Sequence, residues 1–211
     1  MNLRKIILMM PLILLSVSAY AEQATAVKGV YERLDHMKFS FDGNQVEVIE
    51  FLSFYCGHCY HFEKAIPVIR GNFPKKIKWT TVPIYWGNGS PKPGEAYFLA
   101  EEAGKGEEMK KALFQAAIVD KRDIGNIEVL DDIGLKIGLG FDYSRRLRSG
   151  EKAREVGEAI LKSKAYNIDE TPSLIIAGNL KTSPGMVKGS ADLLRENVII
   201  MLKSLFGSEQ N

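Results

Sequence analysis

The hydrophobic pattern begins with two apolar runs that predict neighbouring strands. Residues 46–55 (VEVIEFLSFY) are polar at only three positions, which is typical of a central strand buried on both faces. Residues 77–84 (IKWTTVPI) predict a second strand. Between them the apolar residues take helical spacing from Cys56 to a stop at 71–74. Pro67 predicts a kink in that helix, because its ring clashes with the carbonyl four residues earlier.

A long helical stretch follows, and strand patterns return near the C-terminal end. Within 93–168 the spacing predicts helices at 95–103, 107–119, 127–139 and 151–166. The last part predicts strands at 173–177 and 180–187, a Gly178-Asn179 turn between them, and a helix at 191–206 with Ser190 as its N-cap. The order of elements is therefore strand–helix–strand, a helical region, and two strands with a final helix.

The first 21 residues have the pattern of a cleavable secretory signal peptide. Arg4 and Lys5 precede an uncharged apolar run at 6–15, and Ala19-Tyr20-Ala21 has the small-x-small form of a cleavage site. The run is too short for a comfortable membrane span. We therefore expect the mature chain to begin at Glu22 and to be exported.

The charge balance argues against nucleic acid as a partner. The chain has 28 basic and 26 acidic residues, and the predicted leader removes two basic residues and no acidic ones, leaving 26 against 26. Phosphate binding needs a concentrated basic surface, which this balance does not favour. The 190 residues that remain of 211 after removal of 21 are enough to bury a core without disulfides.

The only two cysteines, Cys56 and Cys59, stand two residues apart at the predicted strand-to-helix junction. A disulfide across so short a loop constrains little of the unfolded chain, so reversible redox chemistry explains the spacing better than stabilisation does. Export to an oxidising compartment favours that chemistry. Unpaired backbone N–H groups at a helix start favour a thiolate, which predicts Cys56 as the nucleophile and Cys59 as the resolving thiol.

Two further residues are candidates for tuning this pair. An imidazolium at His58 would add positive charge beside the Cys56 sulfur and favour its thiolate. Glu50 lies in the apolar strand, where burial of a carboxylate is costly, and we expect it to exchange the Cys59 proton through water. The alternative for Glu50 is a glutamate on an edge strand that reaches solvent.

Metal binding is the rival class of function. Cys56, His58, Cys59 and His61 place four possible ligands within six residues, but one helical turn cannot surround a tetrahedral ion. We expect no metal and no cofactor. Two cysteines packed as small hydrophobic residues are the structural alternative.

The segment at 48–63 (VIEFLSFYCGHCYHFE) resembles the active-site segment of the DsbA family of periplasmic thiol:disulfide oxidoreductases, and the resemblance extends over the mature chain. It implies an α/β, thioredoxin-like fold with an inserted all-helical domain. The domains would be 22–92 (first thioredoxin-like part), 93–168 (helical insertion) and 169–211 (second thioredoxin-like part). Position by position, the resemblance implies Cys56 as the attacking thiol, Cys59 as the resolving thiol, Glu50 as the buried acid, and Pro172 as a cis-proline facing the disulfide.

The same resemblance implies a function and partners. An exported, monomeric dithiol oxidase would pass its disulfide to reduced, unfolded secreted proteins in the periplasm, binding them at Thr171 and Pro172, and a DsbB-like membrane oxidase would reoxidise it. Gly57 stands where many members have proline, and Thr171 replaces a common valine, so a disulfide isomerase or reductase is the alternative enzyme. A metal-binding or chaperone-like module is the non-enzymatic alternative.

Overall fold

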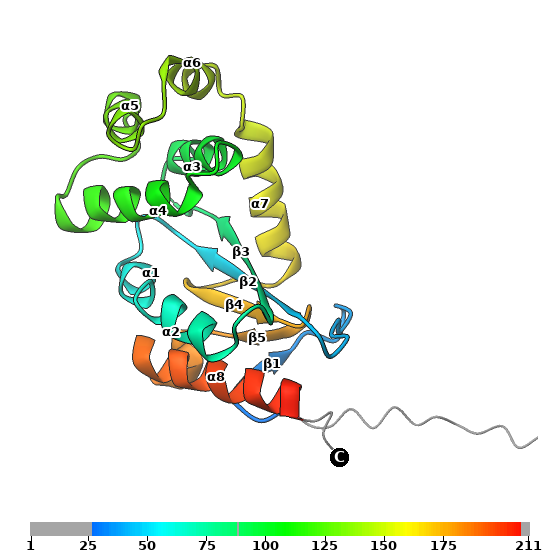
Figure 1. Ribbon diagram of the computed structural model, residues 1–211. Helices are drawn as coiled ribbons and strands as arrows, with labels where there is room; N and C mark the ends of the chain where they lie inside the picture. Colours follow the sequence, from blue (N-terminus) through cyan, green and yellow to red (C-terminus); the bar gives the residue numbers. More distant parts are fainter. Residues whose placement is uncertain (1–26, 88, 208–211) are drawn as a thin grey trace, which may run out of the picture.

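A five-stranded mixed sheet forms the centre of the protein. The computed structural model describes residues 27–87 and 89–207, so the predicted signal peptide lies outside the described residues. The strand order is β1-β5-β4-β2-β3, with β2 and β3 parallel and the other neighbours antiparallel (Figure 1). The strands are β1 (Glu32–Arg33), β2 (Val46–Leu52), β3 (Ile77–Pro83), β4 (Ser173–Ile176) and β5 (Leu180–Thr182).

Helices cover both faces of this sheet. Because side chains alternate along a strand, Val46 and Val48 face one side of β2, and Ile49 and Phe51 face the other. The first side packs against α1 (Gly57–Phe62), α2 (Ala65–Asn72) and α8 (Ala191–Gly207), and the second against α7 (Ala153–Ala165). β2 is therefore a central strand buried on both faces, as its sequence predicts.

The helical region lies between β3 and β4 in the chain and packs above the sheet in Figure 1. Its core joins Leu52 at the end of β2, and Phe54 just after it, to buried residues of the helices. Besides α7, its elements are α3 (Lys92–Glu102), α4 (Gly106–Phe114), the π-helix η1 (Gln115–Val119), α5 (Ile127–Lys136) and α6 (Phe141–Ser149). The predicted fold class is confirmed, whereas the exact domain limits stay a prediction. In the described part of the chain, no helix combines the length and apolar character needed to cross a membrane.

Several boundaries differ from the sequence prediction for identifiable reasons. The predicted helix after Cys56 breaks between α1 and α2 at Glu63, the residue whose carbonyl the Pro67 ring would meet. β5 ends at Thr182, and a 3₁₀ helix, η2 (Pro184–Val187), replaces the rest of the predicted strand, because proline has no N–H for a ladder. Helix α6 was not predicted. Ser190 does cap α8, since its Oγ accepts from Leu193 N at 3.3 Å.

Candidate active site

Cys56 lies at the junction between β2 and α1, where the chain turns from strand to helix. It is the N-cap of α1, with extended backbone angles (φ −95°, ψ 117°), and its N–H donates to Ser53 O at 3.0 Å. Cys56 is partly exposed, whereas Cys59, one turn further on, is fully buried. Both are free thiols, so the structure presents the reduced pair with only one sulfur open to a partner.

The environments of the two thiols push their pKa values in opposite directions. The pKa of Cys56 is lowered to about 5, chiefly because the Cys59 thiol donates a hydrogen bond to the Cys56 sulfur. Thr171 and the backbone N–H groups of Cys59 and His58 lower it further, whereas partial burial raises it. Burial, followed by the neighbouring Cys56, raises the pKa of Cys59 well above its ordinary value. At pH 7 a pKa of about 5 makes the Cys56 thiolate roughly a hundredfold more abundant than its thiol.

The loop before β4 faces the Cys56 sulfur. Cys56 Sγ donates to Thr171 O at 3.2 Å, and the Thr171–Pro172 peptide bond is cis, as the family resemblance implies. Residues 115 positions apart in the sequence therefore meet at the reactive sulfur.

Glu170, which was not predicted from the sequence, holds this loop in place through hydrogen bonds. Its carboxylate accepts from Ser183 Oγ and from Gly185 N, the latter at 3.2 Å, and its carbonyl accepts from Ser173 Oγ at 2.8 Å. A Cβ at Gly185 would lie 2.5 Å from Glu170 Oε1, so glycine is required for this approach. The loop that touches Cys56 is thus tied to the segment that follows β5.

Glu50 is buried beneath the site rather than on a sheet edge. Its strand β2 lies between β4 and β3, and its side chain is 0% exposed, so the edge-strand alternative is wrong. Trp79 Nε1 donates to Glu50 Oε2 at 3.0 Å, and Thr81 Oγ1 donates to it at 3.4 Å. Burial raises the pKa of Glu50, although the nearby Lys110 ammonium opposes that rise.

An apolar groove of about 580 Å³ opens beside the exposed sulfur. Tyr55 and Trp86 form its walls and keep 40% and 46% of their surface in contact with solvent. Tyr55 Oη also accepts from Ser90 N at 3.3 Å, which fixes that ring. The lining residues are Ser53, Tyr55, Cys56, Trp86, Gly89 and Thr171. An extended peptide with apolar side chains would fit this kind of surface.

Comparisons with known proteins agree with this geometry. No protein-family model matches the chain. The thiol:disulfide interchange protein DsbA of Pseudomonas aeruginosa is 24% identical to this chain over 185 residues, which cover 86% of each chain. The DsbA of Azotobacter vinelandii is 23% identical over 152 residues, which cover 72% of this chain and 71% of that protein. The crystal structure of Pseudomonas aeruginosa DsbA superposes with a TM-score of 0.69 at 19% identity, over 86% of this chain and 93% of that one.

The chain is similar in sequence to these DsbA proteins over most of its length. The superposed structure shows the shared thioredoxin-like fold with its helical insertion.

The His58 side chain is exposed, and its backbone N–H is among the groups that lower the pKa of Cys56. An effect of the His58 imidazolium on the sulfur stays a prediction. The other two histidines lie apart from the pair: His61 is exposed, and His36 Nε2 lies 2.9 Å from Ala165 O. Among the described residues no group of three or more His, Cys, Asp or Glu side chains is arranged to hold a metal ion.

We therefore expect His58→Ala to lower the reduction potential only slightly. An imidazolium in water about 4 Å from a thiolate contributes at most about 1 kcal/mol, which corresponds to roughly 20 mV in a two-electron couple. Equilibration with glutathione at pH 7 measures the change. A fall of several tens of millivolts would show instead that the ring folds over the sulfur.

Two charged residues near Glu50 were also missed from the sequence. Lys110 of α4 and Glu63, directly after α1, lie close to Glu50, and the Lys110 ammonium is fully buried. Lys110 stands in a segment rich in Lys and Glu (GEEMKKA, 106–112), and Glu63 is followed by Lys64; such charged sequences predict a solvated surface. Only the helical spacing of Lys110 with Leu113 and Phe114, three and four residues on, places it on the apolar face of α4.

Proposed function

We infer that this protein is a thiol:disulfide oxidoreductase that introduces disulfides into other proteins. The observation that carries this conclusion is the stabilised thiolate on Cys56, the partly exposed member of the Cys56/Cys59 pair. A stable thiolate is a good leaving group, so the disulfide form readily gives up its bond and acts as an oxidant.

The reaction follows from which sulfur can be reached. A client thiolate attacks the Cys56 sulfur of the disulfide, a client–Cys56 bond forms, and the Cys56–Cys59 bond breaks with the electron pair moving to Cys59. The second client thiolate then attacks the client sulfur of this mixed disulfide. Cys56 leaves as a thiolate, the client has lost two electrons, and the protein has gained them.

We propose that the groove beside Cys56 holds the client during this exchange. Tyr55 and Trp86 offer an apolar surface to an unfolded chain, and the Thr171–Pro172 segment offers its backbone to an extended strand opposite the sulfur. Selection for exposed apolar side chains matches a client that is not yet folded.

The setting of the reaction is also part of the proposal. The predicted leader at 1–21 and the cysteine pair support export to the periplasm, where oxidised dithiols persist. There the protein would act as a monomer on reduced, unfolded secreted proteins, and a DsbB-like membrane oxidase would take up its electrons.

The reduction potential tests an oxidase against the isomerase or reductase alternative. We expect equilibration with glutathione to give a potential above about −180 mV, and rapid oxidation of a reduced, unfolded protein. A value near about −270 mV would contradict an oxidase, and rearrangement of scrambled disulfides faster than oxidation of thiols would favour an isomerase.

A further inference from the structure

The groove beside Cys56 ends at the Tyr55 hydroxyl, where two other segments of the chain meet. Tyr55 Oη accepts from Ser90 N at 3.3 Å, so the segment before α3 lies at this end of the groove. Gly125, in the loop between η1 and α5, packs against Ser90, because a Cβ at Gly125 would lie 3.1 Å from Ser90 Cβ. This loop of the helical insertion therefore borders the place where a client would bind.

Asp123 brings a negative charge to this end of the groove. Its Oδ1 accepts from Gly125 N at 2.9 Å and would lie 3.0 Å from the same Cβ, so its carboxylate and Ser90 approach Gly125 together. Burial does most to raise the pKa of Tyr55, and the Asp123 charge raises it further, whereas the hydrogen bonds with Ser90 lower it. The phenol at the end of the groove is therefore close enough to feel the Asp123 carboxylate.

The charge of Asp123 is available to a bound client. Asp123 is exposed, and among the described residues no Lys, Arg or His side chain forms an ion pair with it. Its charged neighbours in the loop have partners: Asp120 accepts from Gln115 Nε2 at 2.8 Å, and Arg122 Nη2 pairs with Asp132 Oδ2 at 2.7 Å. Asp123 therefore keeps a charge that a cation of the client can neutralise.

The walls of the groove suit the rest of a basic side chain. Tyr55 and Trp86 stand exposed beside Cys56. Aromatic faces attract ammonium and guanidinium groups, and the methylenes of lysine and arginine pack on apolar surface while the charged head stays in water. Among the described residues that line the groove, only Cys56 ionises near neutral pH, and it carries no charge in the disulfide. The groove thus offers apolar contact along its walls and a negative charge at one end.

We propose that this end of the groove selects clients that carry an arginine or lysine two residues from the reacting cysteine. Alternate side chains of an extended chain face the same surface, so a side chain at that spacing enters the groove while the cysteine faces Cys56. Its stem lies along Tyr55 and Trp86, and its cation faces Asp123. Asp123 is a specificity-determining residue that acts on the client rather than on the sulfurs, and the proposal rests on the function inferred above.

Reaction of the oxidised full-length mature protein with short peptides tests this selection. Each peptide has one cysteine and is otherwise uncharged, except that arginine, glutamine or glutamate stands two positions before or after the cysteine. Acid quenching followed by mass analysis gives the rate at which the peptide thiolate opens the Cys56–Cys59 disulfide. Because a neighbouring arginine also makes a thiol more reactive, each rate is divided by that of the same peptide with the neutral disulfide of mercaptoethanol.

In the wild type the arginine peptide should react at least about threefold faster than the glutamine peptide at one of the two positions, and the glutamate peptide should react more slowly. Sodium chloride at about 0.5 M should bring the ratio of arginine to glutamine rates toward one, because salt screens exposed charges. Asp123→Asn should lower the ratio to about one, since asparagine keeps an oxygen acceptor for Gly125 N but not the charge. Asp123→Glu should retain most of the ratio.

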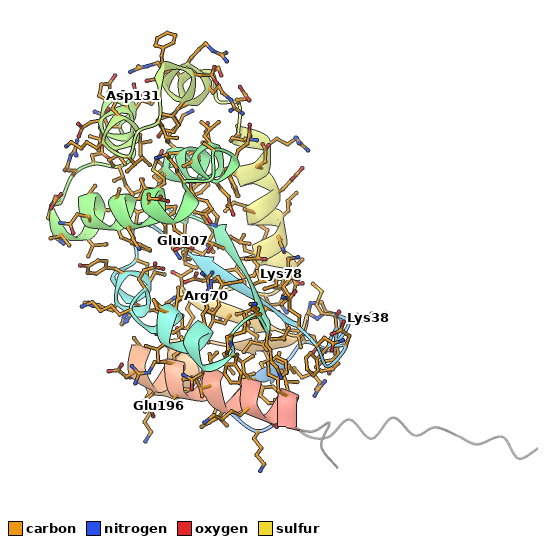
Figure 2. All side chains as sticks on the ribbon, in the orientation of Figure 1. Lys38, Arg70, Lys78, Glu107, Asp131 and Glu196 are labelled. Atoms are coloured by element: carbon orange, nitrogen blue, oxygen red, sulfur yellow. The ribbon has the colours of Figure 1, made fainter. Side chains whose placement is uncertain are left out.

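Two control variants separate the Asp123 charge from the net charge and from the structure of the loop. Glu196→Gln removes the same charge from α8, at the far end of the molecule from the helical insertion in Figure 2, and should leave the ratio unchanged. Lys121→Gln alters the loop that carries Asp123 and removes a positive charge, so the ratio should stay the same or rise. A fall with Lys121→Gln would contradict the proposal, because the structure of the loop would then set the ratio.

The outcomes also distinguish this selection from the function on which it rests. If the wild-type ratio is near one at both positions, does not respond to salt, or persists in Asp123→Asn, the selection is wrong and the oxidoreductase stands. If the oxidised protein forms no mixed disulfide with any peptide, the proposed function is wrong. Circular dichroism identifies a misfolded Asp123→Asn, in which case the salt dependence and the glutamate peptide decide with the wild type alone.

Discussion

Replacing Cys56 by serine is expected to abolish disulfide transfer, whereas Cys59→Ser should trap client proteins on Cys56. The structure explains the asymmetry, because Cys56 is partly exposed beside the groove and Cys59 is fully buried beneath it. A client thiolate can reach only the first sulfur, and without the second thiol the mixed disulfide has no internal route to release.

Non-reducing electrophoresis of each variant mixed with a reduced, unfolded protein measures this difference. Cys59→Ser, first activated as a mixed disulfide with glutathione, should give a covalent client complex that dithiothreitol dissolves, and Cys56→Ser should give none. Equal trapping by the two variants would reverse the assigned roles.

The reduced protein is expected to show one strongly acidic thiol whose pKa depends on Cys59. Thiolate absorbance near 240 nm should titrate with a midpoint near pH 5 and disappear in Cys56→Ser. Because the Cys59 thiol makes the largest contribution to that low pKa, Cys59→Ala should raise the midpoint by more than one pH unit. Cys59→Ser keeps a hydroxyl donor and should restore part of the shift.

The same acidic thiol makes the stability of the reduced form depend on pH. The pKa of Cys56 is lower in the folded protein than its ordinary value of 9.0, so its contribution is complete above pH 9 and is lost as the pH falls toward 5. Denaturant unfolding of the reduced protein should therefore give a free energy that rises between pH 5 and pH 9. The corresponding slope should be smaller in Cys56→Ser, and an equal slope would mean that Cys56 titrates normally.

The sequence predicts those parts of the fold in which pattern and environment agree. The uninterrupted apolar run of β2, the break that Pro67 imposes between α1 and α2, and the Ser190 cap all follow from local rules. Helix α6 was missed because Gly138 and Gly140 precede it and its sequence (FDYSRRLRS) is mostly polar. It is helical because Tyr143 and Leu147, four residues apart, are buried against the other helices.

Some residues of the active site can likewise be predicted from the sequence, and others cannot. Cys56, Cys59 and Glu50 can be found in one continuous segment, since their chemistry is out of place in an apolar strand and its junction. Glu170 contacts Ser183 and Lys110 contacts Glu50, both distant in the sequence, and single-sequence patterns carry no information about such contacts.

The packing of α4 against the active-site helix gives the helical insertion a part in setting the redox pair. The apolar cluster that encloses Cys59 contains Met109, Leu113 and Phe114, and all three come from the insertion rather than from the sheet and its own helices. Without them Cys59 would meet water, its pKa would fall toward that of an ordinary thiol, and the two sulfurs would become more alike. Evolution of the insertion can therefore adjust how unequal the two sulfurs are without altering the Cys-Gly-His-Cys segment.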